Sequence, residues 1–173
     1  MEAFETILSR RSIRHFTGKA VPKEIVQKLL EAGMSAPSAC DFQPWQLIVI
    51  DDRKILDEIP SFHNHAAFLP GAPMAILMCG ELEVSRYWQQ DCAAAAQNIL
   101  LAAHSLGLGA VWLGIFPREN RVVPMRKLLD IPEDIQPMAL IAIGYPAEEK
   151  PPHSKFNMTK VHYNSWMVKY EKT

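Results

Sequence analysis

The stretch SRRSIRHF at residues 9–16 separates a helical segment from an extended one and limits the folds open to this chain. Before it, Phe4, Ile7 and Leu8 recur at helical spacing, which predicts a short first helix. From residue 10 to residue 16 the pattern is extended. Alternating helices and strands further on suggest a doubly wound α/β fold, but the chain opens with a helix and no strand candidate precedes a Gly-x-Gly-x-x-Gly turn. A dinucleotide-binding Rossmann domain is therefore disfavoured.

In the extended segment, alternate side chains share a face, so Arg10, Ser12 and Arg14 point the same way. We call these three residues the donor row. At ~3.3 Å per residue the row is roughly 13 Å long, enough to hold a phosphate at one end and reach the ring of a mononucleotide at the other. Hydrogen bonds to charged groups contribute ~1.5–3 kcal/mol each, so several donors together support tight binding. The alternative is a solvated basic turn at a helix C-terminus, the commoner meaning of such a run on its own.

A second candidate segment is the loop SAPSACDFQP at residues 35–44. Its small residues let backbone groups approach a flat ligand, and Gln43 offers both a donor and an acceptor to a heterocycle. The alternative is an ordinary connection between a helix and a strand. Further along, Lys155 in the stretch PPHSK could supply another phosphate cation, or it could be an inert surface lysine.

Two longer helices and four strands are predicted from the remaining pattern. One helix opens at Pro22 and stops near Gly33, and another covers residues 87–106. The second is apolar on most faces, so we expect it to be buried almost all round, which favours cover from another subunit. Short apolar runs bounded by Gly or Pro predict strands at residues 45–50, 74–79, 110–115 and 138–143, the first of them buried.

The last segment, residues 147–173, is polar and rich in proline but carries Phe156, Tyr163, Trp166 and Tyr170. Disordered tails are poor in aromatic residues, so we expect this one to lie against its own subunit or a neighbour.

Composition bounds the class of protein. The chain has 173 residues, 49% of them hydrophobic and 21% charged, which fits one folded domain. Its net charge is -1 and no basic run is present, so nucleic-acid binding is not expected. An acidic N-terminus without a following apolar run, and no stretch of ~18–20 apolar residues, predict neither a signal peptide nor a membrane span. Cys40, Cys79 and Cys92 form no Cys-x-x-Cys pair, so we expect a reducing cytoplasm and no zinc site or disulfide scaffold.

Taken together, four motifs in order resemble those of the nitroreductase family, over nearly the whole chain. Each motif is weak alone, but four in register are specific. They are SRRSIRHF (9–16), SAPS with QPW (35–38 and 43–45), AAHSLGLGAVWLG (102–114), and GYP with PPHSK (144–146 and 151–155).

The resemblance implies an α+β fold with a mixed, largely antiparallel sheet flanked by helices. Residues 1–173 would form one FMN-binding domain in an intertwined homodimer, with residues 147–173 as an arm that packs on the partner subunit. One FMN per subunit would lie at the dimer interface. By position, the resemblance assigns the following residues to FMN: Arg10, Arg11, Ser12, Arg14, Ser38, Ala39, Cys40, Gln43, Leu113, Gly114 and Lys155.

The resemblance also divides the work among these residues. Arg10 and Ser12 would hold the phosphate and ribityl end, with help from Arg11 through its backbone or side chain, and Lys155 would be a late phosphate cation. Arg14 would lie near the pyrimidine side of the flavin ring. The stretch Ser38–Cys40 would come from the other subunit, Gln43 would lie near the ring, and Leu113 and Gly114 would lie along the isoalloxazine.

The implied activity is ping-pong transfer of reducing equivalents from NADH or NADPH to an electron-poor acceptor such as a nitroaromatic or a quinone. The flavin would carry the chemistry, with no catalytic side chain, and Arg14 would tune its potential. Reductive dehalogenation, flavin cleavage, FMN binding without turnover, and a structural dimer with no flavin stay open as alternatives. Two positions depart from the family pattern: Asp41 replaces a common Asn, and His153 replaces a common second cation.

Overall fold

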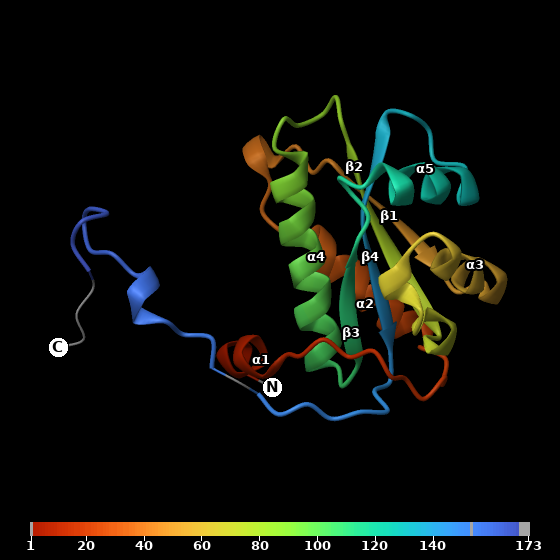
Figure 1. Ribbon diagram of the computed structural model, residues 1–173, viewed down its shortest axis with the longest axis horizontal. Helices are drawn as coiled ribbons and strands as arrows, with labels where there is room; N and C mark the ends of the chain where they lie inside the picture. The colour runs from red at the N-terminus through yellow and green to blue at the C-terminus, as the bar shows by residue number, and fades with distance from the viewer. Residues whose placement is uncertain (1, 153, 170–173) are drawn as a thin grey trace.

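A four-stranded antiparallel sheet forms the centre of the molecule (Figure 1), whose computed structural model describes residues 2–152 and 154–169. The strand order is β1-β2-β4-β3. An isolated parallel bridge joins Ser12 to Ala110 at the β3 edge, outside the named strands. The predicted α+β fold with a largely antiparallel sheet is confirmed. All four predicted strands are present: β1 (Trp45–Ile50), β2 (Met74–Glu81), β3 (Gly109–Gly114) and β4 (Ile135–Gly144).

The two central strands are buried on both faces because a hydrophobic core lies on each side of the sheet. Along β2, Ile76 and Met78 face one core, while Leu77 and Cys79 face the other. The prediction that β1 is a buried strand is wrong. It lies at the edge of the sheet, and only its two end residues are buried.

Helices cover both faces of the sheet, and two of the predicted ones begin and end close to their expected positions. Pro22 is the N-cap of the second helix rather than its first residue, and that helix ends one residue after Gly33. Two further helices, α3 and α5, were not predicted. The five helices are α1 (Ala3–Ser9), α2 (Lys23–Met34), α3 (Arg53–Glu58), α4 (Trp88–Ser105) and α5 (Glu119–Leu128).

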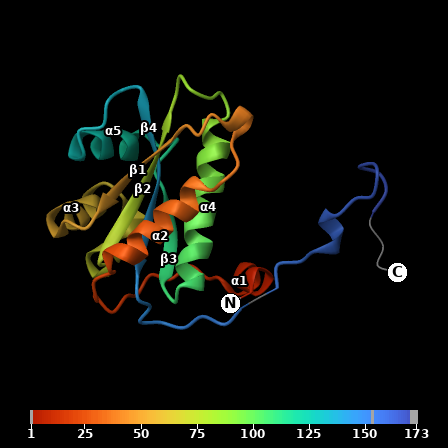
Figure 2. The same ribbon diagram turned by 180° about the vertical axis from the view of Figure 1, so that it is seen from behind.

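The long helix α4 packs against α2 and against all four strands (Figures 1 and 2), and eight of its 18 residues are buried. Gly33 permits the close approach of α2, since a Cβ there would lie 2.9 Å from Ile99 Cγ1. The residues Gln89, Gln90 and Gln97 stay exposed. Ala93, Ala94, Leu101 and Ala102 are half-buried, so within one subunit the expectation of burial almost all round is met only in part.

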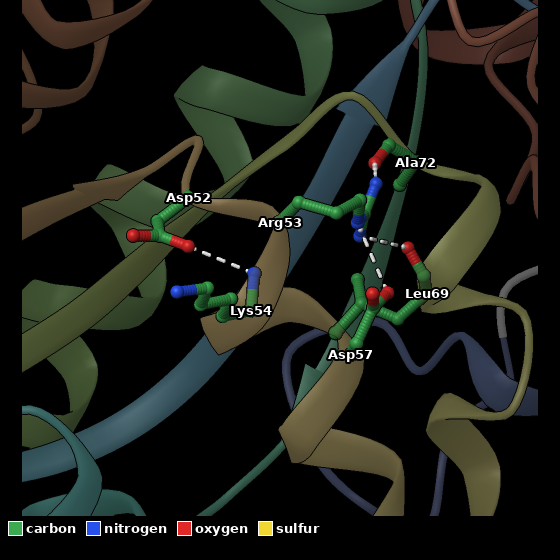
Figure 3. Close-up of polar contacts among 6 residues, drawn as sticks. All are labelled: Asp52, Arg53, Lys54, Asp57, Leu69 and Ala72. Atoms are coloured by element: carbon green, nitrogen blue, oxygen red, sulfur yellow. Dashed lines mark hydrogen bonds and ion pairs between the residues drawn. The ribbon is translucent and has the colours of Figure 1, made fainter.

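On the opposite face, Arg53 ties α3 to the segment that leads into β2 (Figure 3). Its guanidinium donates to Asp57 Oδ1 at 3.0 Å, to the Ala72 carbonyl at 2.9 Å and to the Leu69 carbonyl at 3.3 Å. Asp52 caps the same helix by accepting from the Lys54 backbone N–H at 2.8 Å. These contacts fix the end of a segment of short 3-10 turns: η2 (Ile59–Ser61), η3 (Asn64–Ala66) and η4 (Leu69–Gly71).

The C-terminal arm extends away from the body in both views (Figures 1 and 2) and includes the short turn η5 (Met158–Lys160). Phe156 is 71% exposed and Trp166 is 79% exposed, so the aromatic side chains of the arm find little cover in their own subunit. Tyr170 lies outside the described residues. None of the described helices is both long and apolar enough to cross a membrane. Large exposed apolar side chains gathered in one segment are typical of a protein–protein contact.

Candidate functional site

The donor row follows α1 and is joined to the edge strand β3. The Ile13 backbone N–H donates to the Ala110 carbonyl at 3.1 Å, and the Ile13 side chain is buried. Gly109 makes room for that side chain, because a Cβ at Gly109 would lie 2.6 Å from Ile13 Cγ2. Since Ile13 points into the core, its neighbours Ser12 and Arg14 point away from it.

Glu148 and Lys150 hold the backbone of the donor row from the other side. Glu148 Oε1 accepts from the backbone N–H groups of Arg14 at 2.6 Å and His15 at 3.3 Å. Lys150 Nζ donates to the Ser12 carbonyl at 2.8 Å and to Glu148 Oε1 at 2.9 Å. The Arg14 N–H bond, followed by the Lys150 contact, lowers the pKa of Glu148 to about 2. The side chains of Ser12 and Arg14 have no hydrogen bond to another described residue, so they remain available to a ligand.

Arg10, Arg11 and Lys155 line one pocket of about 1030 Å³ between α1 and the start of the arm. Arg11 Nη1 donates to the Pro151 carbonyl, which holds the arm beside the donor row. Burial and the neighbouring Arg11 charge lower the pKa of Arg10. The pocket therefore suits a ligand with both an anionic group and an apolar surface. Its lining also includes the acidic Glu2 and Glu5, the polar Ser154, and the apolar Phe4, Ile7, Leu8, Pro152 and Phe156.

The loop Ser38–Gln43 lies at the other end of the molecule and is anchored by a buried carboxylate. Asp91, which is 5% exposed, accepts from the Ala39 backbone N–H at 3.0 Å and from Ser85 Oγ at 2.9 Å. Asp91 belongs to the first turn of α4. Because both carboxylate oxygens are used, the loop is held firmly to the N-terminal end of that helix.

The backbone of this loop is strained in a way that its hydrogen bonds offset. Cys40, Asp41 and Gln43 have φ angles of 50°, 56° and 49°, a region in which residues other than glycine are uncommon. Ser38 Oγ accepts from the Gln43 backbone N–H at 3.0 Å. The Gln43 side-chain amide donates to Asp41 Oδ1 at 2.9 Å. The amide donor that we expected Gln43 to offer a ligand is therefore used within the loop, by the Asp that replaces the common Asn. Strain of this kind is frequent at ligand-binding segments.

The two candidate segments lie at opposite ends of α4. Asp91 holds the loop at one end, and near the other end His104 Nε2 lies 2.8 Å from Ser9 Oγ, next to Arg10. Burial and the Arg10 charge lower the pKa of His104. Asp91 and His104 are 13 residues apart in the sequence, so about 20 Å of helix separates the two contacts. The donor row and the loop of one subunit therefore lie well apart, near opposite ends of α4.

Leu113 and Gly114, at the end of β3, differ in what they can offer a ligand. The Leu113 side chain is 4% exposed and belongs to the core, so only its backbone is available. A Cβ added at Gly114 would meet no atom within 4 Å. The Gly114 carbonyl accepts from His63 Nε2 at 3.0 Å and from Arg121 Nη1 at 2.7 Å. Gly114 thus presents open space on a backbone that is held in place.

Several of these residues were missed in the sequence, and one predicted position is not described. Most of the hydrogen bonds in question join a side chain to a backbone group, and such contacts produce no recognisable spacing in the sequence. The side chains are those of Glu148, Asp91, His63 and Arg121. The one available signal was that Asp91 is an acid in an otherwise apolar helix. His153 lies outside the described residues.

Comparison with known proteins gives one family. The model of the nitroreductase family matches residues 7–63 and 60–145. A protein of Methanothermobacter thermautotrophicus, provisionally named NADH dehydrogenase/NAD(P)H nitroreductase, is 44% identical over 169 residues, covering 96% of this chain and 88% of the relative.

Solved structures agree with the sequence relatives. A protein of Bacteroides thetaiotaomicron, provisionally given the same name, superposes with a TM-score of 0.93 at 45% identity, covering 95% of this chain and 98% of that one. An FMN-dependent nitroreductase of Clostridium difficile R20291 superposes with a TM-score of 0.90 at 32% identity, covering 94% and 99%.

Proposed function

Because the chain belongs to the nitroreductase family, we propose that it is an FMN-dependent oxidoreductase that transfers reducing equivalents from NADH or NADPH to an electron-poor acceptor. Nitroaromatics and quinones are the acceptor classes we expect. The observation that carries the proposal is the pocket in which Arg10, Arg11 and Lys155 come together beside apolar side chains. The names of two similar proteins, one an NAD(P)H nitroreductase and one FMN-dependent, support the same cofactors.

The residues present fit FMN. Three cations in one pocket match a phosphate, and the open space at Gly114 matches the close approach of a flat ring. Arg10, Arg11 and Lys155 would hold the phosphate, Ser12 the ribityl chain, and Arg14 the pyrimidine side of the ring. Bound FMN supplies the redox chemistry, and the chain binds it, orients it and sets its electrostatic surroundings. In this proposal no side chain acts as a nucleophile or an obligatory acid.

The proposal includes a homodimer, because each site needs segments from opposite ends of α4. The donor row of one subunit would bind FMN together with Ser38, Ala39, Cys40 and Gln43 of a second copy. The exposed aromatic side chains of the arm, residues 147–173, would pack on that copy. With its three cysteines free, the chain suits a reducing cytoplasm.

We expect a ping-pong order, in which the electron donor and the acceptor bind in turn. The test is the visible spectrum of the purified protein before and after denaturation, followed by anaerobic mixing with NADH and with NADPH. We expect released FMN, rapid bleaching of the flavin, and reoxidation by nitroaromatics or quinones. A protein that binds no FMN offered in excess contradicts the proposal. Bound FMN that is not bleached identifies a binding protein, and turnover confined to halogenated acceptors or to reduced flavin identifies another reaction.

A further inference from the structure

We propose that His63 and Arg121 act as positioning residues that fix the Gly114 carbonyl beside the flavin ring, and that the Arg121 charge raises the reduction potential of the bound flavin. This rests on the proposed function, which puts the ring along Gly114. It adds a second, independent source of electrostatic tuning to the one expected of Arg14.

The open space at Gly114 is unusual among the strand glycines. A Cβ at Gly80 would lie 2.5 Å from Trp88, one at Gly109 would lie 2.6 Å from Ile13, and one at Gly144 would lie 2.5 Å from Pro73. Packing therefore explains those three glycines. At Gly114 no atom lies within 4 Å of that position, and its φ is not in the left-handed region. Neither packing nor backbone geometry requires glycine there, which points to the approach of a ligand.

Two elements distant in the sequence converge on the carbonyl of this glycine. His63 comes from the segment of 3-10 turns and donates from Nε2 at 3.0 Å, while Arg121 comes from α5 and donates from Nη1 at 2.7 Å. A carbonyl oxygen has two lone pairs, so both are used and the direction of the peptide is fixed. Arg53 braces the far end of the His63 segment through Leu69 and Ala72 (Figure 3). The carbonyl is thus held by a rigid frame.

Of the two donors, only Arg121 contributes a charge. His63 is 1% exposed and its Nδ1 has no hydrogen-bond partner among the described residues, as expected for a neutral ring that donates from Nε2. Burial, and next the Arg121 charge, lower the pKa of His63, which keeps the ring neutral. Arg118, at the N-cap of α5, lowers the pKa of Arg121, and His65 contributes to lowering that of His63. Glu119 lies in the first turn of α5.

Among the described residues, Arg121 forms no ion pair within 4.0 Å. Within residues 2–152 and 154–169, ion pairs closer than 4.0 Å form only between Arg53 and Asp57 and between Glu148 and Lys150. The positive end of the α5 dipole adds to the same potential. Reduction adds negative charge to a flavin, so an unpaired cation held at a fixed distance favours the reduced form. Because Arg121 is only partly exposed, its effect is screened less than that of the exposed Arg14.

The test is an anaerobic potentiometric titration of the FMN-loaded protein with the variants R121Q, R121K and R118Q. We expect R121Q to weaken the preference for the reduced flavin at least tenfold, which is about 30 mV for a two-electron couple. R121K keeps the charge and should stay closer to the wild-type potential. R118Q removes a neighbouring cation of the same helix that does not touch Gly114, so its potential should change little.

R121Q with the wild-type potential and bound FMN overturns the inference, as does an equal shift in R118Q. Failure of the wild-type protein to bind FMN instead contradicts the proposed function. The geometry can also be tested without FMN or any variant, by ¹⁵N NMR of His63 in the FMN-free protein at neutral pH. We expect a neutral ring protonated at Nε2, and a ring protonated at Nδ1 or at both nitrogens would contradict the two-donor contact.

Discussion

At the residue scale, Glu148 stabilises the donor row by accepting from two backbone N–H groups and from Lys150. Its pKa is lowered from 4.5 to about 2, so the folded state binds its proton less tightly than the unfolded state does. The resulting stabilisation is fully present above pH 4.5 and is lost as the pH falls toward 2.

We therefore expect E148Q to lower the free energy of unfolding by about 1 kcal/mol at pH 7, a modest amount because the pair is partly exposed. Gln keeps an acceptor for the Arg14 N–H but loses the charge. Urea unfolding of both proteins from pH 7 to pH 2 measures the difference, which should shrink below pH 4.5. A difference independent of pH would show that the charge of Glu148 contributes nothing.

Gly109 and Gly114 allow a matched pair of substitutions on one strand. G109A places a methyl group 2.6 Å from Ile13 Cγ2, so we expect a loss of roughly 1–3 kcal/mol in unfolding free energy. G114A meets no atom and should leave stability within about 0.5 kcal/mol of the wild type, while FMN affinity falls about tenfold or more. Chemical unfolding and FMN titration of both variants provide the measurements. Unchanged FMN affinity in G114A would show that the flavin ring does not lie beside Gly114.

What the sequence predicts at this scale depends on where a residue makes its contacts. Arg10, Arg11 and Lys155 could be predicted as candidates because cations in recognisable motifs suit an anionic ligand, and the structure brings all three to one pocket. His63 could not, because it bonds a carbonyl 51 residues away, and Asp91 bonds a backbone N–H 52 residues away. Contacts to backbone groups depend only on the fold, so no residue type at either position reveals them.

At the scale of elements, the four strands were predicted because each is a short apolar run with clear boundaries. The edge position of β1 was not predicted, because a short apolar run has the same pattern in an edge strand as in a central strand. The helix α5 contains Pro124, and α3 has only six residues, so neither shows a helical period long enough to recognise.

The contact between α4 and the loop Ser38–Gln43 gives a prediction about an element. D91A leaves the Ala39 N–H without its acceptor, which costs ~1–3 kcal/mol when the group is buried, and releases a strained loop. We expect weaker FMN binding with little change in turnover once the flavin is saturating. S85A is the control, because it removes the other bond of Asp91 and keeps the contact with Ala39.

FMN titration and urea unfolding of the two variants separate the roles. If the loop matters for the flavin, D91A loses affinity and S85A does not, even where both lose stability. Equal losses of affinity in both variants would mean that Asp91 acts only on general stability.

At the scale of the whole molecule, the proposed FMN site depends on how α4 separates the donor row from the loop. The donor row lies near its C-terminal end and the loop near its N-terminal end, with about 20 Å of helix between His104 and Asp91, which contact them. In a two-fold dimer, each FMN would meet the donor row of one subunit and the loop of the other. Each subunit then contributes to both sites. A substitution in the donor row and one that affects the loop can therefore be placed in the same subunit or in different subunits of a dimer.

Two heterodimers, each isolated with a different tag on each subunit, distinguish this arrangement from sites formed within one subunit. The first pairs an R10A subunit with a D91A subunit, and the second pairs an R10A/D91A subunit with a wild-type one. If each site takes its donor row and its loop from different subunits, the first heterodimer keeps one intact site, while both sites of the second carry a defect. If each site belongs to a single subunit, the first has no intact site and the second has one. We expect tight binding of one FMN per dimer in the first heterodimer and none in the second, measured by fluorescence titration. The reverse result would mean that the flavin does not bridge the subunits.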